Sequence, residues 1–164
     1  LDLPMLPAVP EPAPKPQGAV NVDPAALPGI ALDDAQAELQ GTWNRSSSFK
    51  PHIGTGYLHD DRRGDGRSVA TFRFTAPKTG RFEMRMAYSA HETRAKNVPV
   101  VVQNGGRRTE FAADQTKPLP AGAAFRSIGT VELDGGGETV VTVSNTGTEG
   151  FVILDALQFV EEKE

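Results

Sequence analysis

Hydrophobic and polar residues alternate strictly in the middle of the chain, between residues 81 and 88. The apolar or aromatic positions of this stretch are Phe82, Met84, Met86 and Tyr88. A period of two residues is typical of a strand with one face buried and the other in water. A second, β-branched run follows at Val98–Val102. Pro99 indicates that this run starts there or lies at an edge, because proline has no N–H for a sheet ladder.

Six further segments have the composition of strands and are separated by turn signals. They are Ile30–Asp34, Ser68–Thr75, Arg107–Ala112, Phe125–Leu133, Glu138–Ser144 and Phe151–Val160. Asn104-Gly105 between two runs is typical of a tight hairpin. Only Asp34–Gln40 could be helical, and it is short. Many short strands with regular turns predict an all-β fold, an antiparallel β-sandwich of jelly-roll type.

The first 28 residues differ in composition from the rest and hold eight of the 13 prolines. Alternating prolines favour an extended, semi-rigid spacer. We therefore expect a Pro-rich linker or tail over residues 1–28 and one domain over residues 29–162. Since the chain begins with Leu1, we interpret it as a processed form or an internal fragment of a larger protein.

Composition excludes several classes of function. The 17 Lys and Arg and 21 Asp and Glu give a net charge of −4, so there is no basic excess to hold a nucleic acid. The absence of cysteine excludes disulfides and thiolate metal sites. No apolar run approaches the roughly 20 residues needed to span a bilayer.

A hydrolytic site is the first catalytic possibility to consider. The serines at 46–48 with His52 or His59 and an acid could form a nucleophile, a base and an orienting group. However, the strand–turn–helix nucleophile elbow is missing. We therefore expect a non-catalytic domain, with the hydrolase kept as a minor alternative.

The sequence contains more candidate binding residues than candidate catalytic residues. The candidate ligand-binding set is Trp43, Tyr57, His59, Asp60, His91, Arg94 and Asn97. Trp43 is the single tryptophan, and it either packs in the core or stacks on a sugar ring. His59 could bind a ligand or make a structural hydrogen bond, and Arg94 and Asn97 could equally hold loops together. Arg94 and Lys96 would suit an acidic polysaccharide through charge-assisted hydrogen bonds.

Asp155 lies within an apolar stretch, and the pattern leaves its environment open. If it shares the core face with Phe151 and Ile153, a buried carboxylate must be paired or coordinated. Candidate partners are a Ca²⁺ ion shared with Asp33 or Asp34, an arginine such as Arg94, or turn amides. If the opposite face is the core, Asp155 is exposed.

The same segments resemble the golvesin / xanthan lyase carbohydrate-binding-like domain, from Leu32 to Val160. The resemblance is carried by Leu32-Asp33-Asp34, Gly41-Thr42-Trp43, Gly54-Thr55-Gly56-Tyr57-Leu58-His59-Asp60, Arg94-Ala95-Lys96-Asn97-Val98-Pro99-Val100, Ile128-Gly129-Thr130 and the run from Val143 to Phe159. The chain departs from this pattern at Lys50-Pro51-His52, where the family more often carries an aromatic residue before the glycines.

The resemblance implies an extracytoplasmic bacterial accessory module attached to an enzyme. It would bind carbohydrate or cell-envelope polysaccharide; the alternative is a docking module that binds a partner protein domain and no free glycan. The opening and closing segments of the domain, Ala31–Asp34 and Leu154–Ala156, are also similar to the two ends of calcium-containing sandwich modules. By analogy, Asp33, Asp34 and Asp155 would share a structural Ca²⁺ ion.

Overall fold

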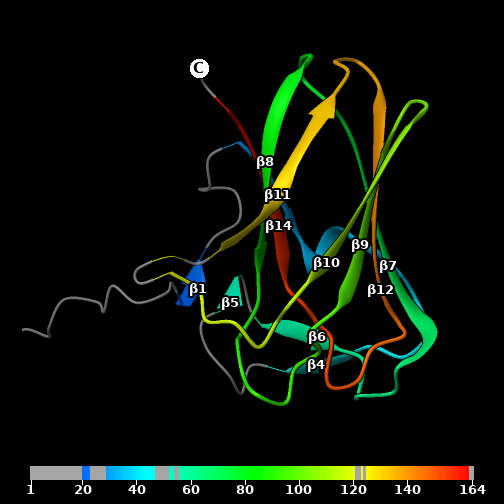
Figure 1. The fold of residues 1–164 in the computed structure, drawn as a ribbon, viewed down its shortest axis with the longest axis vertical. Helices are drawn as coiled ribbons and strands as arrows, with labels where there is room; N and C mark the ends of the chain where they lie inside the picture. The colour runs from blue at the N-terminus through cyan, green and yellow to red at the C-terminus, as the bar shows by residue number, and fades with distance from the viewer. Residues whose placement is uncertain are drawn as a thin grey trace, which may run out of the picture.

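The alternating segments form two antiparallel sheets that face each other across a common core (Figure 1). The computed structural model describes residues 29–46, 56–120, 123 and 125–162, and the backbone of residues 20–22 and 52–53. The predicted linker lies mostly outside the described residues. The short strand β1 (Val20–Val22) falls within it, however, and pairs in parallel with β5 (His52–Ile53).

One sheet has five strands and the other has four. In spatial order, the five-stranded sheet contains β10 (Arg107–Ala113), β9 (Val98–Asn104), β12 (Glu138–Thr146), β7 (Asp65–Thr75) and β3 (Glu38–Gln40). The four-stranded sheet contains β11 (Arg126–Leu133), β8 (Gly80–Ala87), β14 (Ala156–Glu161) and β2 (Ile30–Asp33). The β-sandwich expected from the sequence is therefore confirmed.

A third, small sheet lies across the lower end of the sandwich in Figure 1. It contains β13 (Ile153–Leu154), β6 (Tyr57–His59) and β4 (Asn44–Ser46). These strands are two or three residues long, too short to show a period in the sequence. β6 and β4 were not predicted, because only pairing across the fold defines them, whereas β13 lies within the predicted strand Phe151–Val160.

The core is built from the buried faces of the two large sheets. Met84 and Met86 of β8 lie opposite Phe159 and Leu157 of β14, and all four side chains are buried. Alternation in β8 is thus confirmed, since its apolar positions point inward. Pro99 is the second residue of β9, in register with Ala112 of β10, which confirms its place at the start of a strand.

Asp34–Gln40 is not a helix. A single 3₁₀ turn, η3 (Asp34–Gln36), is followed directly by β3. Asp33 caps the turn: its carboxylate accepts from Ala35 N–H at 3.3 Å, and Gln36 Oε1 accepts from Asp33 N–H at 2.8 Å. Ala37 then returns to an extended conformation, and pairing with β7 overrides the local helical propensity.

The final apolar stretch is also interrupted. It forms β13 and β14, with Asp155 between them, instead of one strand. Every side chain from Val152 to Phe159 is buried, Asp155 included. The open question about Asp155 is therefore answered in favour of burial. Among the described residues, no helix is long and apolar enough to cross a membrane.

Candidate functional site

Three loops meet beside the small sheet and enclose a hollow of about 450 Å³, here called the apolar hollow. Its lining residues are Ser46, Tyr57, His59, Asp61, His91, Thr93, Arg94, Phe151 and Ile153. Four members of the predicted binding set, Tyr57, His59, His91 and Arg94, thus come together at one place. A concave site with a few polar groups among apolar and aromatic walls is typical of small-ligand binding.

A second hollow of about 400 Å³, here called the charged hollow, shares Thr93 and Arg94 with the first. Its other lining residues are Arg62, Glu92, Lys96, Asn97, Gly147, Glu149 and Gly150. Asn97 is exposed, and its side-chain amide donates to the carbonyl of Gly147 at 3.1 Å. The two hollows therefore lie on either side of a shared wall.

Both histidines of the apolar hollow are held in a defined orientation. His59 Nδ1 accepts the backbone N–H of Asp61 at 3.1 Å, and His91 Nδ1 accepts that of Thr93 at 3.2 Å. Because Nδ1 is the acceptor in both residues, the N–H donor of each neutral ring is at Nε2. The ring of His59 also packs edge-on against Phe151, with 5.5 Å between ring centroids.

This tautomer argues against the hydrolytic arrangement. In a Ser-His-Asp site, the histidine Nδ1–H donates to an orienting carboxylate. Here, a backbone amide donates to His59 Nδ1 instead. Ser46 lines the same hollow as His59, whereas Ser47 and Ser48 lie outside the described residues.

Arg94 organises the wall between the hollows. Its guanidinium donates to Ser89 O at 2.9 Å and Ser89 Oγ at 3.1 Å, and to Thr93 Oγ1 at 3.3 Å. It lies 5.9 Å from the centre of the Phe151 ring, and only 5% of the residue is exposed. Burial lowers the pKa of the Arg94 guanidinium, and Tyr57 opposes this shift. These contacts account for Arg94 as a loop-holding residue, and its predicted ligand contact stays a prediction.

Asp60 is fully buried and ties three segments together. Its Oδ1 accepts from the N–H groups of Arg62 and Val152, at 3.0 and 2.9 Å. Its Oδ2 accepts from Gly64 N–H at 3.4 Å and Asn145 Nδ2 at 2.9 Å. The carboxylate thus holds the turn after β6 against β12 and the start of the last apolar stretch, and it offers no exposed surface to a ligand.

Trp43 lines neither hollow. It is half-buried and packs against the core cluster. Its indole Nε1 is buried and has no hydrogen-bond partner among the residues that the structure describes. These contacts agree with the alternative in which Trp43 packs in the core, and sugar stacking by Trp43 stays a prediction.

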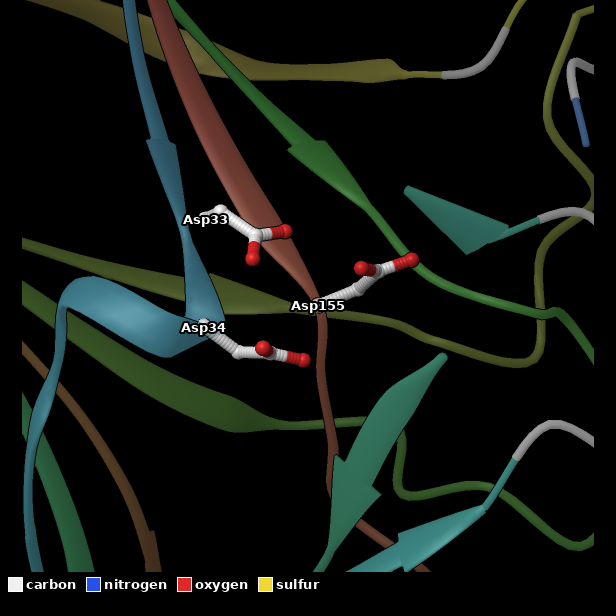
Figure 2. A group of neighbouring side chains, drawn as sticks. All are labelled: Asp33, Asp34 and Asp155. Carbon is white, nitrogen blue, oxygen red and sulfur yellow. The ribbon is translucent and has the colours of Figure 1, made fainter. Parts of the chain in front are cut away.

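Three acidic side chains gather where the first and last strands of the four-stranded sheet meet (Figure 2). Asp33 ends β2, Asp34 begins the 3₁₀ turn and Asp155 precedes β14. One carboxylate oxygen of each lies within 4.8 Å of the others. This spacing fits a shared Ca²⁺ ion, whose oxygen ligands lie about 2.3–2.6 Å from it.

The negative charge of this acidic cluster is only partly compensated by a neighbouring arginine. Arg45 donates to Asp34 Oδ1 at 3.2 Å. Asp33 Oδ1 and Asp34 Oδ2 are buried and accept no hydrogen bond from any described residue. Burial, with the neighbouring Asp33 charge, raises the pKa of Asp34 to about 7, and Arg45 opposes the shift. A bound cation would satisfy these oxygens.

Several lining residues were not in the predicted set, notably Asp61, Arg62 and Phe151. The sequence carried one signal for Phe151, namely the glycine before it. Gly150 has φ +103°, and a Cβ there would lie 2.7 Å from Thr93 O. Only glycine permits this approach, through which Phe151 N–H donates to Thr93 O at 2.9 Å.

Solved structures of two other modules share the fold of this domain. A CBM35 module from Cellvibrio japonicus Abf62 superposes with a TM-score of 0.56 at 21% identity, over 82% of this chain and 94% of that one. A CBM35 module from Paenibacillus barcinonensis gives 0.56 at 17% identity, over 82% and 100%. At this identity the likeness shows the fold alone, the β-sandwich that this domain shares with both modules.

Residues 30–161 match the Golvesin C-terminal domain family, and the chain belongs to this family. The resemblance stated from the sequence is thereby confirmed. The chain is 33% identical to xanthan lyase of Bacillus sp. (strain GL1) over 149 residues, which cover 87% of this chain and 16% of that protein. The structure of Paenibacillus xanthan lyase aligns with a TM-score of 0.72 at 27% identity, over 82% of this chain and 13% of that one.

Proposed function

We propose that this domain is a non-catalytic module that binds carbohydrate in the apolar hollow. The observation that carries this proposal is the hollow itself, in which His59, His91 and Phe151 lie along one concave surface at the loop end, beside the buried Tyr57. Ring faces pack against the apolar faces of sugars, while the His59 N–H donates to a hydroxyl oxygen. Membership of the golvesin family and the named carbohydrate-binding modules of the same fold support it.

The wider role follows from the size of the chain relative to its relatives. Since the chain covers 16% of Bacillus xanthan lyase, an attached enzyme would be the main part of a protein of this kind. A module that binds an extracytoplasmic polysaccharide would raise the local concentration of that enzyme near its substrate.

A glycan array, followed by calorimetry with the full 164-residue chain, tests the proposal. Saturable binding is expected, and His59→Ala should weaken it about tenfold, because a lost donor to a ligand hydroxyl costs about 1.4 kcal/mol. Gln103→Ala, an exposed position on the five-stranded sheet, is the matched control and should bind as the unmodified chain does. Silence across the array would overturn the proposal and favour the docking alternative.

We further propose that Asp33, Asp34 and Asp155 hold a structural cation of the Ca²⁺ type. Its support is the pair of buried carboxylate oxygens that accept no hydrogen bond from described residues, on Asp33 and Asp34. The ion would clamp β2 to β14. Titration with Ca²⁺ at pH 7.5 should raise the melting temperature of the unmodified chain and leave that of Asp34→Asn unchanged. An equal response of both proteins, or of neither, would overturn the site.

A further inference from the structure

The turn after β6 holds two successive non-glycine residues in the left-handed region, Asp61 with φ 60° and Arg62 with φ 61°. Aspartate tolerates this conformation, but arginine has no short polar group to compensate for the crowding of its Cβ. The buried Asp60 carboxylate maintains the turn by accepting the N–H groups of Arg62 and Gly64. Strained residues of this kind persist mainly at functional sites.

The result of this strain is the position of the Arg62 side chain. Asp61 lines the apolar hollow, whereas Arg62 lines the charged hollow. The Arg62 guanidinium lies 5.8 Å from the centre of the Phe151 ring, at the wall that separates the two hollows. The turn thus places an exposed cation directly beside the proposed sugar site.

The charges of the charged hollow indicate what it could hold. Arg62 and Lys96 supply exposed cations, while Glu92 and Glu149 supply exposed carboxylates. A simple polyanion such as phosphate would be repelled by the two glutamates. A sugar acid can interact with the residues of both charges. Its carboxylate accepts from Arg62 and Lys96, and its hydroxyls donate to the glutamates.

We propose that Arg62 is the specificity-determining residue of the site and selects glycans that carry carboxylates, with the acidic unit in the charged hollow and its neighbour in the apolar hollow. This inference rests on the proposed carbohydrate binding and names its ligand class. It also transfers acid recognition from Arg94, whose guanidinium is buried among Ser89 and Thr93, to Arg62.

The test compares glycans that differ only in charge. Oligogalacturonate, oligomannuronate and oligoglucuronate are each paired with the carboxyl-reduced form of the same oligosaccharide, and binding is measured by calorimetry with the full chain. The unmodified chain should bind at least one acidic member about tenfold more tightly than its neutral twin, and salt should reduce the difference. Arg62→Ala should remove the difference, by lowering the affinity for the acidic member to that for its neutral twin.

Two further variants separate charge and fold from recognition. Arg63→Ala removes the same charge from the same turn at a residue that lines neither hollow, so it should keep the acid preference. Arg62→Gly should lose that preference as Arg62→Ala does, yet melt about 3 °C higher than Arg62→Ala, because glycine fits the left-handed turn.

The possible outcomes discriminate between the two proposals. Equal affinity of the unmodified chain for acidic and reduced forms, or an acid preference that survives Arg62→Ala, overturns the role of Arg62 alone. A chain that binds no glycan on the array or in the paired set overturns the proposed function together with this inference.

Discussion

Asp60→Asn is the sharpest test of how the site is held together. The substitution keeps the shape of the side chain but replaces one carboxylate oxygen by an NH₂ group. Whichever way the amide is oriented, two acceptor contacts become donor–donor contacts. If Nδ2 replaces Oδ2, it faces Asn145 Nδ2 at 2.9 Å and Gly64 N at 3.4 Å. The protein therefore loses two charge-assisted hydrogen bonds and leaves buried donors unsatisfied.

The expected magnitude follows from these two losses. A hydrogen bond to a buried charge contributes about 1.5–3 kcal/mol, and an unsatisfied buried donor costs about 1–3 kcal/mol. Because some relaxation is expected, the free energy of unfolding should fall by about 3 kcal/mol, and the melting temperature by about 10 °C. Urea unfolding and calorimetry measure both quantities.

Asp61→Asn is the matched control, since it makes the same chemical change one residue later at a side chain that is 54% exposed. It should change stability by no more than about 0.5 kcal/mol. In a double-mutant cycle, Asn145→Ala combined with Asp60→Asn should cost about 1 kcal/mol less than the sum of the two, because the stranded Asn145 donor is gone. Equal stability of Asp60→Asn and Asp61→Asn would refute this account of Asp60.

Two other expectations concern the acidic cluster and the loop contact. In EDTA, the Asp34 carboxyl ionises near its usual 3.8 when unfolded but near 7 when folded, so its contribution to stability is present below pH 4 and is lost as the pH rises towards 7. Thermal melts from pH 4 to 8 should show this loss, up to about 4 kcal/mol, and Asp34→Asn should flatten it; identical profiles would contradict it. Gly150→Ala should destabilise the domain by about 3 kcal/mol, because its Cβ would lie 2.7 Å from Thr93 O. Gly147→Ala, also at positive φ but with nothing within 4 Å of its Cβ, should cost about 1 kcal/mol, and equal losses would show that the close approach at Gly150 does not matter.

The sequence alone determined the architecture of this domain to a large extent. The period-2 pattern from Phe82 to Tyr88, the β-branched run at Val98 and the Asn104-Gly105 turn predicted β8, β9 and the hairpin that leads to β10, whereas β3 lies in the segment expected to be helical. These signals are local, since burial of one face of a strand is written in alternate residues. Asp155 was identified because a carboxylate within an apolar stretch stands out, whereas Asp33 and Asp34 were joined to it by analogy with calcium-containing sandwich modules.

Only the tertiary structure decided which residues form the hollows and which support them. Asp60 and Arg94 looked like surface groups for a ligand, yet both are buried, Asp60 through partners as distant in sequence as Asn145 and Val152. Arg62 and Phe151 carry no local pattern that marks them as neighbours. Their contact depends on a strained turn and on a close approach at a glycine, and both arise from non-local packing. A pattern of period two records which side of a strand is buried, but it holds no information on which loops meet at the end of a sandwich.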